Sequence, residues 1–194
     1  KNMYKKEYSE IINMFYGIHV SKIKSLESDY LNLTPEPFFN IMLPISQNKT
    51  LEGSFELYAT TEKMTGENKI FNEETNKKED AEKTLLFWSL PNILIVTLKR
   101  FSANLRKNQD LVDFPLENLD LRKYVIGYDK KSYVYDLYGI CNHSGNVMGG
   151  HYTSFVKNAN GKWYHFNDTS VSQVKNLSSL KSNKAYCFFY RKKS

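Results

Sequence analysis

Two adjacent glycines followed by a histidine, Gly149-Gly150-His151, form the most chemically suggestive segment of the sequence. Histidine titrates near neutral pH and can therefore serve as a base. Glycine lets an extended ligand backbone approach closely. Because His151 also begins an apolar segment typical of a strand, the spacing predicts either a general base at this position or a structural histidine at a strand end.

The other three histidines occupy ordinary strand or turn positions. His19 has no acidic neighbour in its expected strand, and His165 alternates with aromatic residues. His143 lies beside Ser144-Gly145, where a hydrogen bond to the loop is favoured over a place in a cleft. We therefore expect structural roles for all three.

Asn167 and Asp168 lie where a partner for His151 is needed. A tight turn at 158–161 would return the strand 163–166 along the strand that begins at His151. Asn167 would then accept the Nδ1 proton of His151 and fix its tautomer. If the strand continues, Asp168 points elsewhere, although its charge could still serve the cleft. The alternative is a simple turn cap at these residues.

Cys141 and Cys187 are the two cysteines of the chain, too few for a disulfide framework, which favours a reducing compartment. Cys141 lies in an expected strand ten residues before His151, and Cys187 lies in the apolar run 185–190. We expect both to be buried small hydrophobes rather than nucleophiles.

The elements that would position these side chains are mostly strands. Ser9 and Thr50 are suited to cap two short helices. Pro35 and Pro37 are expected to break the chain before a buried strand, and the polar stretch 62–83 is expected to be a solvated turn. The predicted strands are 17–24, 38–43, 93–98, 133–140, 151–156, 162–166 and 185–190, of which 93–98 is the candidate for a central strand.

Composition excludes several classes of protein. At 194 residues, with 41% hydrophobic and 25% charged residues, the chain is typical of one globular domain. The net charge of +6 comes from scattered lysines, which indicates a solvated surface and no nucleic-acid partner. With no apolar run of about 20 residues and no signal peptide, we expect no membrane partner and a cytoplasmic or nuclear location. The first residues show no domain opening, so the chain is expected to begin within a longer protein.

The segments around His151 resemble the C-terminal box of the ubiquitin-specific proteases, and further segments match that family in order along nearly the whole chain. The matching segments are Gly17, 36–39, 81–83, 90–101, 112–116, 135–139, 149–153, 163–171 and 185–190.

This resemblance implies an α+β, papain-like cysteine protease core, with mainly antiparallel sheet and the helical thumb largely absent. It implies one domain over 1–194, with fingers at about 17–95 and a palm at about 93–194. His151 would be the general base, Asn167 its orienting partner and Asp168 a weaker assignment near the oxyanion. Gly149, Gly150 and Tyr152 would line the channel for the Gly-Gly tail of ubiquitin, between blocking loops at 102–110 and 142–148.

Two departures from the family pattern stand out. The nucleophilic cysteine box is missing, since the residues before Gly17 contain no cysteine. The family's fingertip zinc is expected to be lost, because its two Cys-x-x-Cys pairs correspond here to Ser25, Ser28, Asn72 and Thr75, which are poor zinc ligands. We therefore predict no metal and no cofactor.

Two hypotheses of function follow. The first is a deubiquitinating thiol protease that acts on ubiquitin or ubiquitin conjugates, with its cysteine supplied by a thumb segment or chain outside this sequence. The alternative is a catalytically inactive pseudoprotease that binds ubiquitin without cutting it. Retention of His151 and Asn167 favours the first hypothesis.

Overall fold

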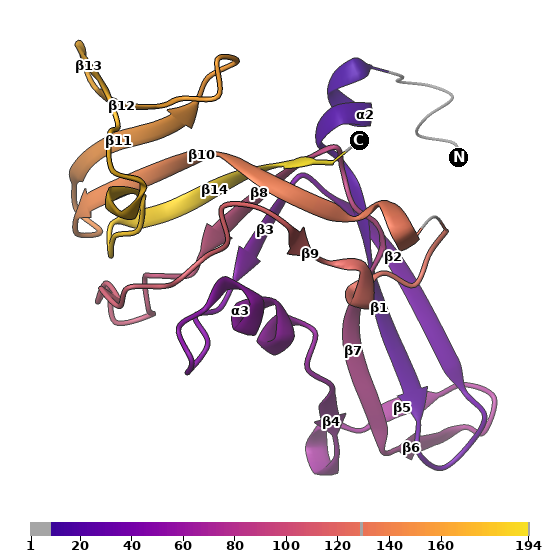
Figure 1. The fold of residues 1–194 in the computed structure, drawn as a ribbon. Coiled ribbons are helices and arrows are strands. Elements are labelled where there is room, and N and C mark those ends of the chain that lie inside the picture. Colours follow the sequence, from indigo (N-terminus) through magenta and orange to yellow (C-terminus); the bar gives the residue numbers. More distant parts are fainter. Residues whose placement is uncertain (1–8, 129, 194) are drawn as a thin grey trace.

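Two capped helices precede most of the strands in the computed structural model, which describes residues 9–128 and 130–193 (Figure 1). Helix α2 (Glu10–Phe15) begins after Ser9, whose hydroxyl accepts a hydrogen bond from the Ile12 N–H. Helix α3 (Leu51–Tyr58) begins after Thr50, whose hydroxyl accepts from the Gly53 N–H at 3.0 Å. Both predicted caps are confirmed, because each hydroxyl satisfies a free N–H of a first turn. The expectation about the first six residues lies outside the described part of the chain.

Four antiparallel strands form the finger sheet, in the order β2 (Leu31–Phe38), β1 (Gly17–Ser25), β7 (Ala81–Ser89) and β4 (Glu62–Met64). These strands run lengthwise down one side of the molecule in Figure 1.

The prediction that Pro35 and Pro37 break the chain is wrong, because both lie inside β2. Pro35 pairs with Val20 and Pro37 with Ile18 on β1. Within the described residues β2 is an edge strand of its sheet. Proline lacks an N–H but is tolerated at a sheet edge, where that group would face away from the ladder.

The polar stretch 62–83 contains more strand than a solvated turn would. Besides β4 and the start of β7, it forms a hairpin of β5 (Ile70–Asn72) and β6 (Lys77–Glu79), with the 3₁₀ turn η1 (Gly66–Asn68) before it. This hairpin lies at the end of the finger sheet that is far from the strands that follow β7 in the chain (Figure 1).

The second and larger sheet is called the palm sheet. Its order is β13 (Ser170–Gln173), β12 (Trp163–Asn167), β11 (Gly150–Lys157), β10 (Val134–Gly145), β14 (Ala185–Lys192), β8 (Ile93–Leu98) and β3 (Asn40–Leu43), with β9 (Leu119–Asp120) beside β10. Strands β3 and β8 are parallel and the other neighbours are antiparallel.

Strand β8 is paired on both sides, which confirms the prediction of a central strand at 93–98. Strand β3 lies inside the sequence range expected for the fingers, yet it pairs with β8 in the palm sheet. After β1 and β2 the chain therefore leaves the finger sheet and enters the palm sheet as β3. It then returns to the finger sheet, where it forms β4 and β7. The remaining 3₁₀ turns are η2 (Arg122–Tyr124), η3 (Lys130–Ser132) and η4 (Leu177–Leu180).

One hydrophobic core joins the palm sheet to helix α3. Leu51 and Phe55 of the helix are fully buried, and the same core contains Phe188 and Tyr190 of β14. The rings of Phe114 and Phe188 are 4.7 Å apart between centroids, a packed aromatic pair. A mainly antiparallel α+β fold is thus confirmed. No helix in the described ranges is long and apolar enough to cross a membrane.

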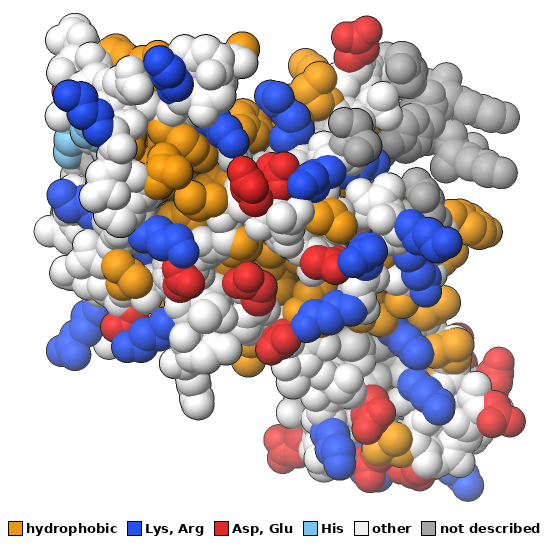
Figure 2. Space-filling model, viewed as in Figure 1, with side chains coloured by type: hydrophobic (Ala, Val, Ile, Leu, Met, Phe, Trp, Pro, Cys, Tyr) orange, Lys and Arg blue, Asp and Glu red, His pale blue; other side chains and the backbone are white. Residues whose placement is uncertain are grey.

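Charged side chains of both signs are interspersed over the face shown in Figure 2. Lysine and arginine side chains alternate there with acidic ones instead of gathering into a single basic stripe.

Candidate active site

The structure brings His151 and Asn167 together at one end of the palm sheet. Strands β11 and β12 are antiparallel, with Ser154 opposite Phe166. Continuing this register by one residue places Asn167 opposite Thr153, on the same face as His151 because side chains alternate along a strand. The two side chains meet diagonally, with 2.6 Å between His151 Nε2 and Asn167 Oδ1.

The contacting nitrogen is Nε2, whereas the sequence analysis expected Nδ1. An amide oxygen only accepts hydrogen bonds, so the Nε2–H donates to Asn167 Oδ1. The neutral tautomer fixed in this way leaves Nδ1 with a lone pair. His151 is therefore oriented to accept a proton at Nδ1, and its side chain is 51% exposed.

Asp168 does not point away, because strand β12 ends at Asn167. Asn167 pairs with Ser170, so Asp168 and Thr169 form a two-residue hairpin loop. Asp168 adopts a left-handed backbone with φ of 49°, which Asp tolerates better than most residues. Its Oδ2 lies 4.0 Å from His151 Nε2 and its side chain is 77% exposed, so it adds negative charge beside the imidazole without replacing Asn167.

The two glycines before His151 have different surroundings. A Cβ on Gly150 would lie 2.3 Å from both the Ser144 carbonyl oxygen and His143 Nε2, and no side chain fits there. A Cβ on Gly149 would meet nothing within 4 Å. Gly150 is thus required by the packing of β10 on β11, while Gly149 leaves open space beside the site.

His143 bonds to a loop, as its position predicts, but its ring also borders a hollow beside Gly149 and Gly150, which was not expected. It is 4% exposed, and its ring lies 4.7 Å from that of Tyr152 between centroids. Lys107 Nζ donates to the His143 carbonyl oxygen at 2.6 Å and lies 3.1 Å from Nδ1. Burial, and then the charge of Lys107, lowers the pKa of His143. This buried ring therefore joins the loop 102–110 to the Gly-Gly segment. His143 lies two residues after Cys141, and this spacing in a strand predicts that the two side chains share one face of the sheet.

Arg100 is a second residue that was missed, and it anchors the loop 102–110. Its Nε donates to the Ala185 carbonyl and its Nη1 to the Asp110 carbonyl, each at 2.8 Å. The guanidinium is buried, and burial lowers its pKa. Strand β14 and the end of the loop are therefore tied to one side chain.

Two hollows flank His151. One of about 370 Å³ is bordered by His151, Thr153 and Asn167. The other, of about 210 Å³, is bordered by Gly149, Gly150 and Tyr152. Because alternate residues of β11 face opposite sides of the sheet, the predicted catalytic pair and Tyr152 border different hollows.

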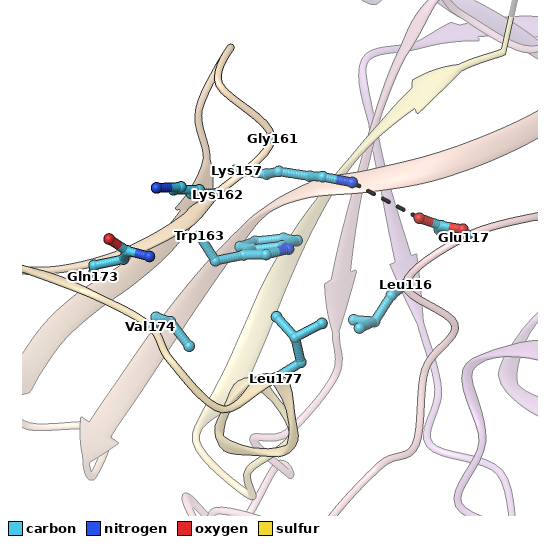
Figure 3. A pocket seen from close by; sticks show the side chains of 9 residues that line it. All are labelled: Leu116, Glu117, Lys157, Gly161, Lys162, Trp163, Gln173, Val174 and Leu177. Atoms are coloured by element: carbon cyan, nitrogen blue, oxygen red, sulfur yellow. Dashed lines mark ion pairs between the residues drawn. The ribbon is translucent and has the colours of Figure 1, made fainter.

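A further pocket, drawn in Figure 3, lies at the far ends of the same strands. Trp163 lies among the side chains that line it, and Lys157 extends past the ring toward Glu117 with 3.8 Å between the charged atoms. Trp163 and Lys157 pair with each other at the opposite ends of β12 and β11 from Asn167 and His151. This pocket is separate from the candidate active site.

Neither cysteine has the surroundings of a nucleophile. Cys141 and Cys187 face each other across strands β10 and β14. Burial raises the pKa of the Cys141 thiol, and it raises that of Cys187 to about 11. A catalytic cysteine needs a lowered pKa to form its thiolate, so both thiols stay protonated at neutral pH.

An exposed imidazole, oriented through one nitrogen by a carboxamide at the end of an antiparallel sheet, is the arrangement that the base half of a thiol hydrolase site would need, and it makes His151 and Asn167 candidates for these roles.

Comparison with known proteins specifies the family. A protein-family model described as "Ubiquitin carboxyl-terminal hydrolase" matches residues 1–190. The chain belongs to the ubiquitin carboxyl-terminal hydrolase family.

Relatives by sequence include ubiquitin carboxyl-terminal hydrolase 9 of Arabidopsis thaliana, which is 38% identical over 86% of this chain and 19% of the relative. Human ubiquitin carboxyl-terminal hydrolase 15 is 40% identical over 73% of this chain and 15% of the relative. The chain therefore spans less than a fifth of the length of these relatives.

Solved structures confirm the papain-like α+β fold. A chain of the SAGA DUB module bound to monoubiquitin superposes with a TM-score of 0.86 at 30% identity, covering 97% of this chain and 43% of that one. A chain of the yeast SAGA DUB module with a mutant Sgf73 gives a TM-score of 0.84 at 28% identity, covering 100% of this chain and 44% of that one.

Proposed function

We propose that the protein containing this chain is a cysteine-type deubiquitinase that hydrolyses the peptide or isopeptide bond after the C-terminal glycine of ubiquitin. The chain supplies the base and its orienting partner, His151 and Asn167, and a segment outside the chain supplies the nucleophilic cysteine. The observation that carries the proposal is the 2.6 Å contact between His151 Nε2 and Asn167 Oδ1, which leaves Nδ1 available.

The proposed reaction makes use of that geometry. His151 Nδ1 takes the proton of the cysteine thiol, and the thiolate attacks the glycine carbonyl carbon. The protonated imidazole then gives the proton to the departing lysine or α-amino nitrogen, which leaves a thioester. Water, deprotonated by the same Nδ1, hydrolyses the thioester and releases the ubiquitin carboxylate and the free thiol. Asn167 keeps the ring aligned through both halves of the reaction.

A neutral orienting residue distinguishes this site from one with aspartate in that place. Asn167 contributes no charge to stabilise the imidazolium that forms, so this stabilisation falls mainly to the thiolate. Asp168 supplements it from 4.0 Å, but a side chain this exposed is strongly screened by water.

The proposal requires a nucleophile from elsewhere, since Cys141 and Cys187 are held in the sheet as protonated thiols. A chain that spans less than a fifth of its relatives leaves room for such a segment.

Ubiquitin is the proposed substrate because the family name and the ubiquitin-bound structural neighbour both indicate it. Gly149, Gly150 and Tyr152 are proposed to contact its Gly-Gly tail, with the finger sheet and the palm sheet holding its globular part. The division into fingers and palm as functional units stays a prediction, as does a cytoplasmic or nuclear location.

The test uses the full protein that contains this chain and ubiquitin with a thiol-reactive group at its C-terminus. We expect a covalent adduct of one ubiquitin per protein, mapped by mass spectrometry to a cysteine other than Cys141 and Cys187, and its loss in a His151→Ala variant.

Two other outcomes decide against this mechanism. Ubiquitin binding without an adduct would identify the catalytically inactive ubiquitin-binding module instead. Absence of both binding and adduct would exclude ubiquitin as the substrate.

A further inference from the structure

At the far end of the finger sheet, four side chains from two turns converge on the carboxylate of Glu79. The Ser25 and Ser28 hydroxyls donate to Oε2 at 2.6 and 2.7 Å. The Thr75 hydroxyl and the Asn72 amide donate to Oε1 at 2.5 and 3.0 Å. Ser25 is the last residue of β1 and Ser28 lies in the turn that follows it, and Asn72 and Thr75 belong to the β5–β6 hairpin. We call residues 25–30 and 70–80 the fingertip.

The centre of the cluster is buried and its polar atoms are satisfied, while Ser28 is half-buried and Thr75 is exposed at its rim. Glu79 is 4% exposed and Asn72 is fully buried. Ser25 Oγ, besides donating to Glu79, accepts the backbone N–H groups of Glu27 and Ser28 at 3.0 and 3.1 Å. The hydroxyl thus uses its one donor and both acceptor sites. A buried carboxylate is stable only when hydrogen bonds replace its lost water, and this one has four.

The four converging residues are those at which the family resemblance implies zinc ligands, and they do not fit the metal. Zinc requires thiolate, imidazole or carboxylate lone pairs directed at the ion. Here two serine hydroxyls, a threonine hydroxyl and an amide N–H direct hydrogens toward the centre. The centre is therefore built for an anion, the opposite charge to a metal ion.

We propose that the Glu79 carboxylate replaces a metal ion as the common partner of Ser25, Ser28, Asn72 and Thr75, and so joins the two turns of the fingertip. One side chain from the end of β6 holds the β1–β2 turn against the β5–β6 hairpin, and the fingertip needs no metal to keep its shape.

The charge of Glu79 is stabilised by hydrogen bonds and not by a neighbouring cation. Lys69 is paired with Glu27 at 3.3 Å and with Asp80 at 3.2 Å, and among the described residues Glu79 has no ion pair. The hydrogen bonds, that of Ser25 foremost, lower the pKa of Glu79 from 4.5 to about 2. Lys69, Glu27 and Asp80 form a second, more exposed link between the same turns, because Glu27 Oε1 also accepts the Asp80 N–H at 2.7 Å.

The experiment compares backbone amide hydrogen exchange in four proteins: wild type, Glu79→Gln, Thr75→Val and the control Glu73→Gln. Glutamine keeps the shape of Glu79 but presents an NH₂ group to donors that need an acceptor. Hydrogen bonds to a charged group are among the stronger ones, so we expect fingertip exchange to accelerate by about tenfold or more in Glu79→Gln. Thr75→Val removes one donor of four and should accelerate it by a smaller factor. Glu73 is exposed in the same hairpin, and its substitution should change nothing.

Palm amides of β8 and β14 provide the internal reference and should be unaffected in all four proteins. Each exchange series is repeated with zinc chloride and with EDTA, and neither should alter the wild-type fingertip.

The proposal is overturned if fingertip exchange in Glu79→Gln equals that of wild type, or if zinc slows fingertip exchange in wild type. If Glu79→Gln does not fold at all, Thr75→Val decides: fingertip-specific acceleration supports the proposal, and unchanged exchange refutes it. None of these readouts requires ubiquitin or catalysis, so the result is independent of the proposed function.

Discussion

The proposed catalytic edge of the palm sheet consists of His151, Asn167 and Asp168. This edge and the fingertip are both polar clusters at strand ends, and they are built in opposite ways. At the edge, the side chains of His151 and Asp168 are 51% and 77% exposed, and among the described residues His151 Nδ1 has no hydrogen-bond partner. At the fingertip, Glu79 is 4% exposed and both its oxygens are shared among four donors.

The contrast separates reactivity from stability. A group that must exchange a proton with a substrate needs an unused lone pair and access to solvent, and it is therefore held in place by fewer contacts. A group that holds two turns together needs every lone pair occupied. Substitutions of the exposed polar side chains at the edge should therefore change chemistry with little change in folding, and substitutions of the buried polar side chains at the fingertip should do the reverse.

The largest expected effect is at His151. Replacing it by alanine in the full protein removes the proposed base, and we expect the rate of ubiquitin release from a conjugate to fall by at least about 10³-fold. Thermal unfolding should stay at the wild-type temperature, since the side chain is half exposed. A rate within tenfold of wild type would show that His151 is not the base.

The next effect is at Asn167. Alanine there removes the acceptor at 2.6 Å and frees the imidazole to rotate, so we expect kcat to fall by roughly 10²-fold while KM for the conjugate is little changed. Asp168→Asn is the matched control; because Asp168 lies at 4.0 Å, its effect should stay within about tenfold. Equal losses in the two variants would mean that Asp168 shares the orienting role.

The two glycines provide a test inside the catalytic edge itself. Gly150→Ala places a Cβ 2.3 Å from a backbone carbonyl oxygen and should destabilise the fold by ~1–3 kcal/mol. Gly149→Ala enters open space and should change the free energy of unfolding by less than about 0.5 kcal/mol. Urea unfolding measures both. Similar values for the pair would contradict the packing described for Gly150.

The smallest expected effect is the acid sensitivity of the fingertip, which does not show at neutral pH. The pKa of Glu79 is lower in the folded chain, about 2, than its ordinary value of 4.5. Its stabilising contribution is therefore complete above about pH 4.5 and is lost as pH falls toward 2. The difference in fingertip protection between wild type and Glu79→Gln should shrink over this window, as amide NMR can measure. A difference that is constant with pH would show that the carboxylate charge is not what holds the fingertip.

Sequence patterns were sufficient to predict most of the fold. Local signals predicted both helix caps, because Ser9 and Thr50 each act on their own first turn. The central strand 93–98 followed from a short apolar run. What failed depended on neighbours in space: Pro35 and Pro37 are compatible with β2 only because it lies at an edge, and the separate strand β13 carries no strong apolar pattern.

The site was predictable at the level of residues but not of atoms. The spacing between His151 and Asn167, with a turn between them, was enough to expect their contact. Which imidazole nitrogen makes the contact depends on side-chain rotamers, and the return of Asp168 toward His151 depends on one left-handed residue. The family resemblance placed Ser25, Ser28, Asn72 and Thr75 at one site. Glu79 as their common partner was out of reach, because hydroxyl and amide groups far apart in sequence give no pattern that indicates a shared carboxylate.

The Glu79 cluster also bears on how the chain tolerates oxidants. A fingertip built on cysteine thiolates can be converted stepwise to sulfenic, sulfinic and sulfonic acids, and its last steps are not readily reversed. Serine, threonine, asparagine and glutamate side chains do not undergo that sequence. If the proposed catalytic thiol is oxidised by mild peroxide only as far as the sulfenic acid, the fingertip would be spared, and the activity lost at that first step could be recovered by a reductant without refolding.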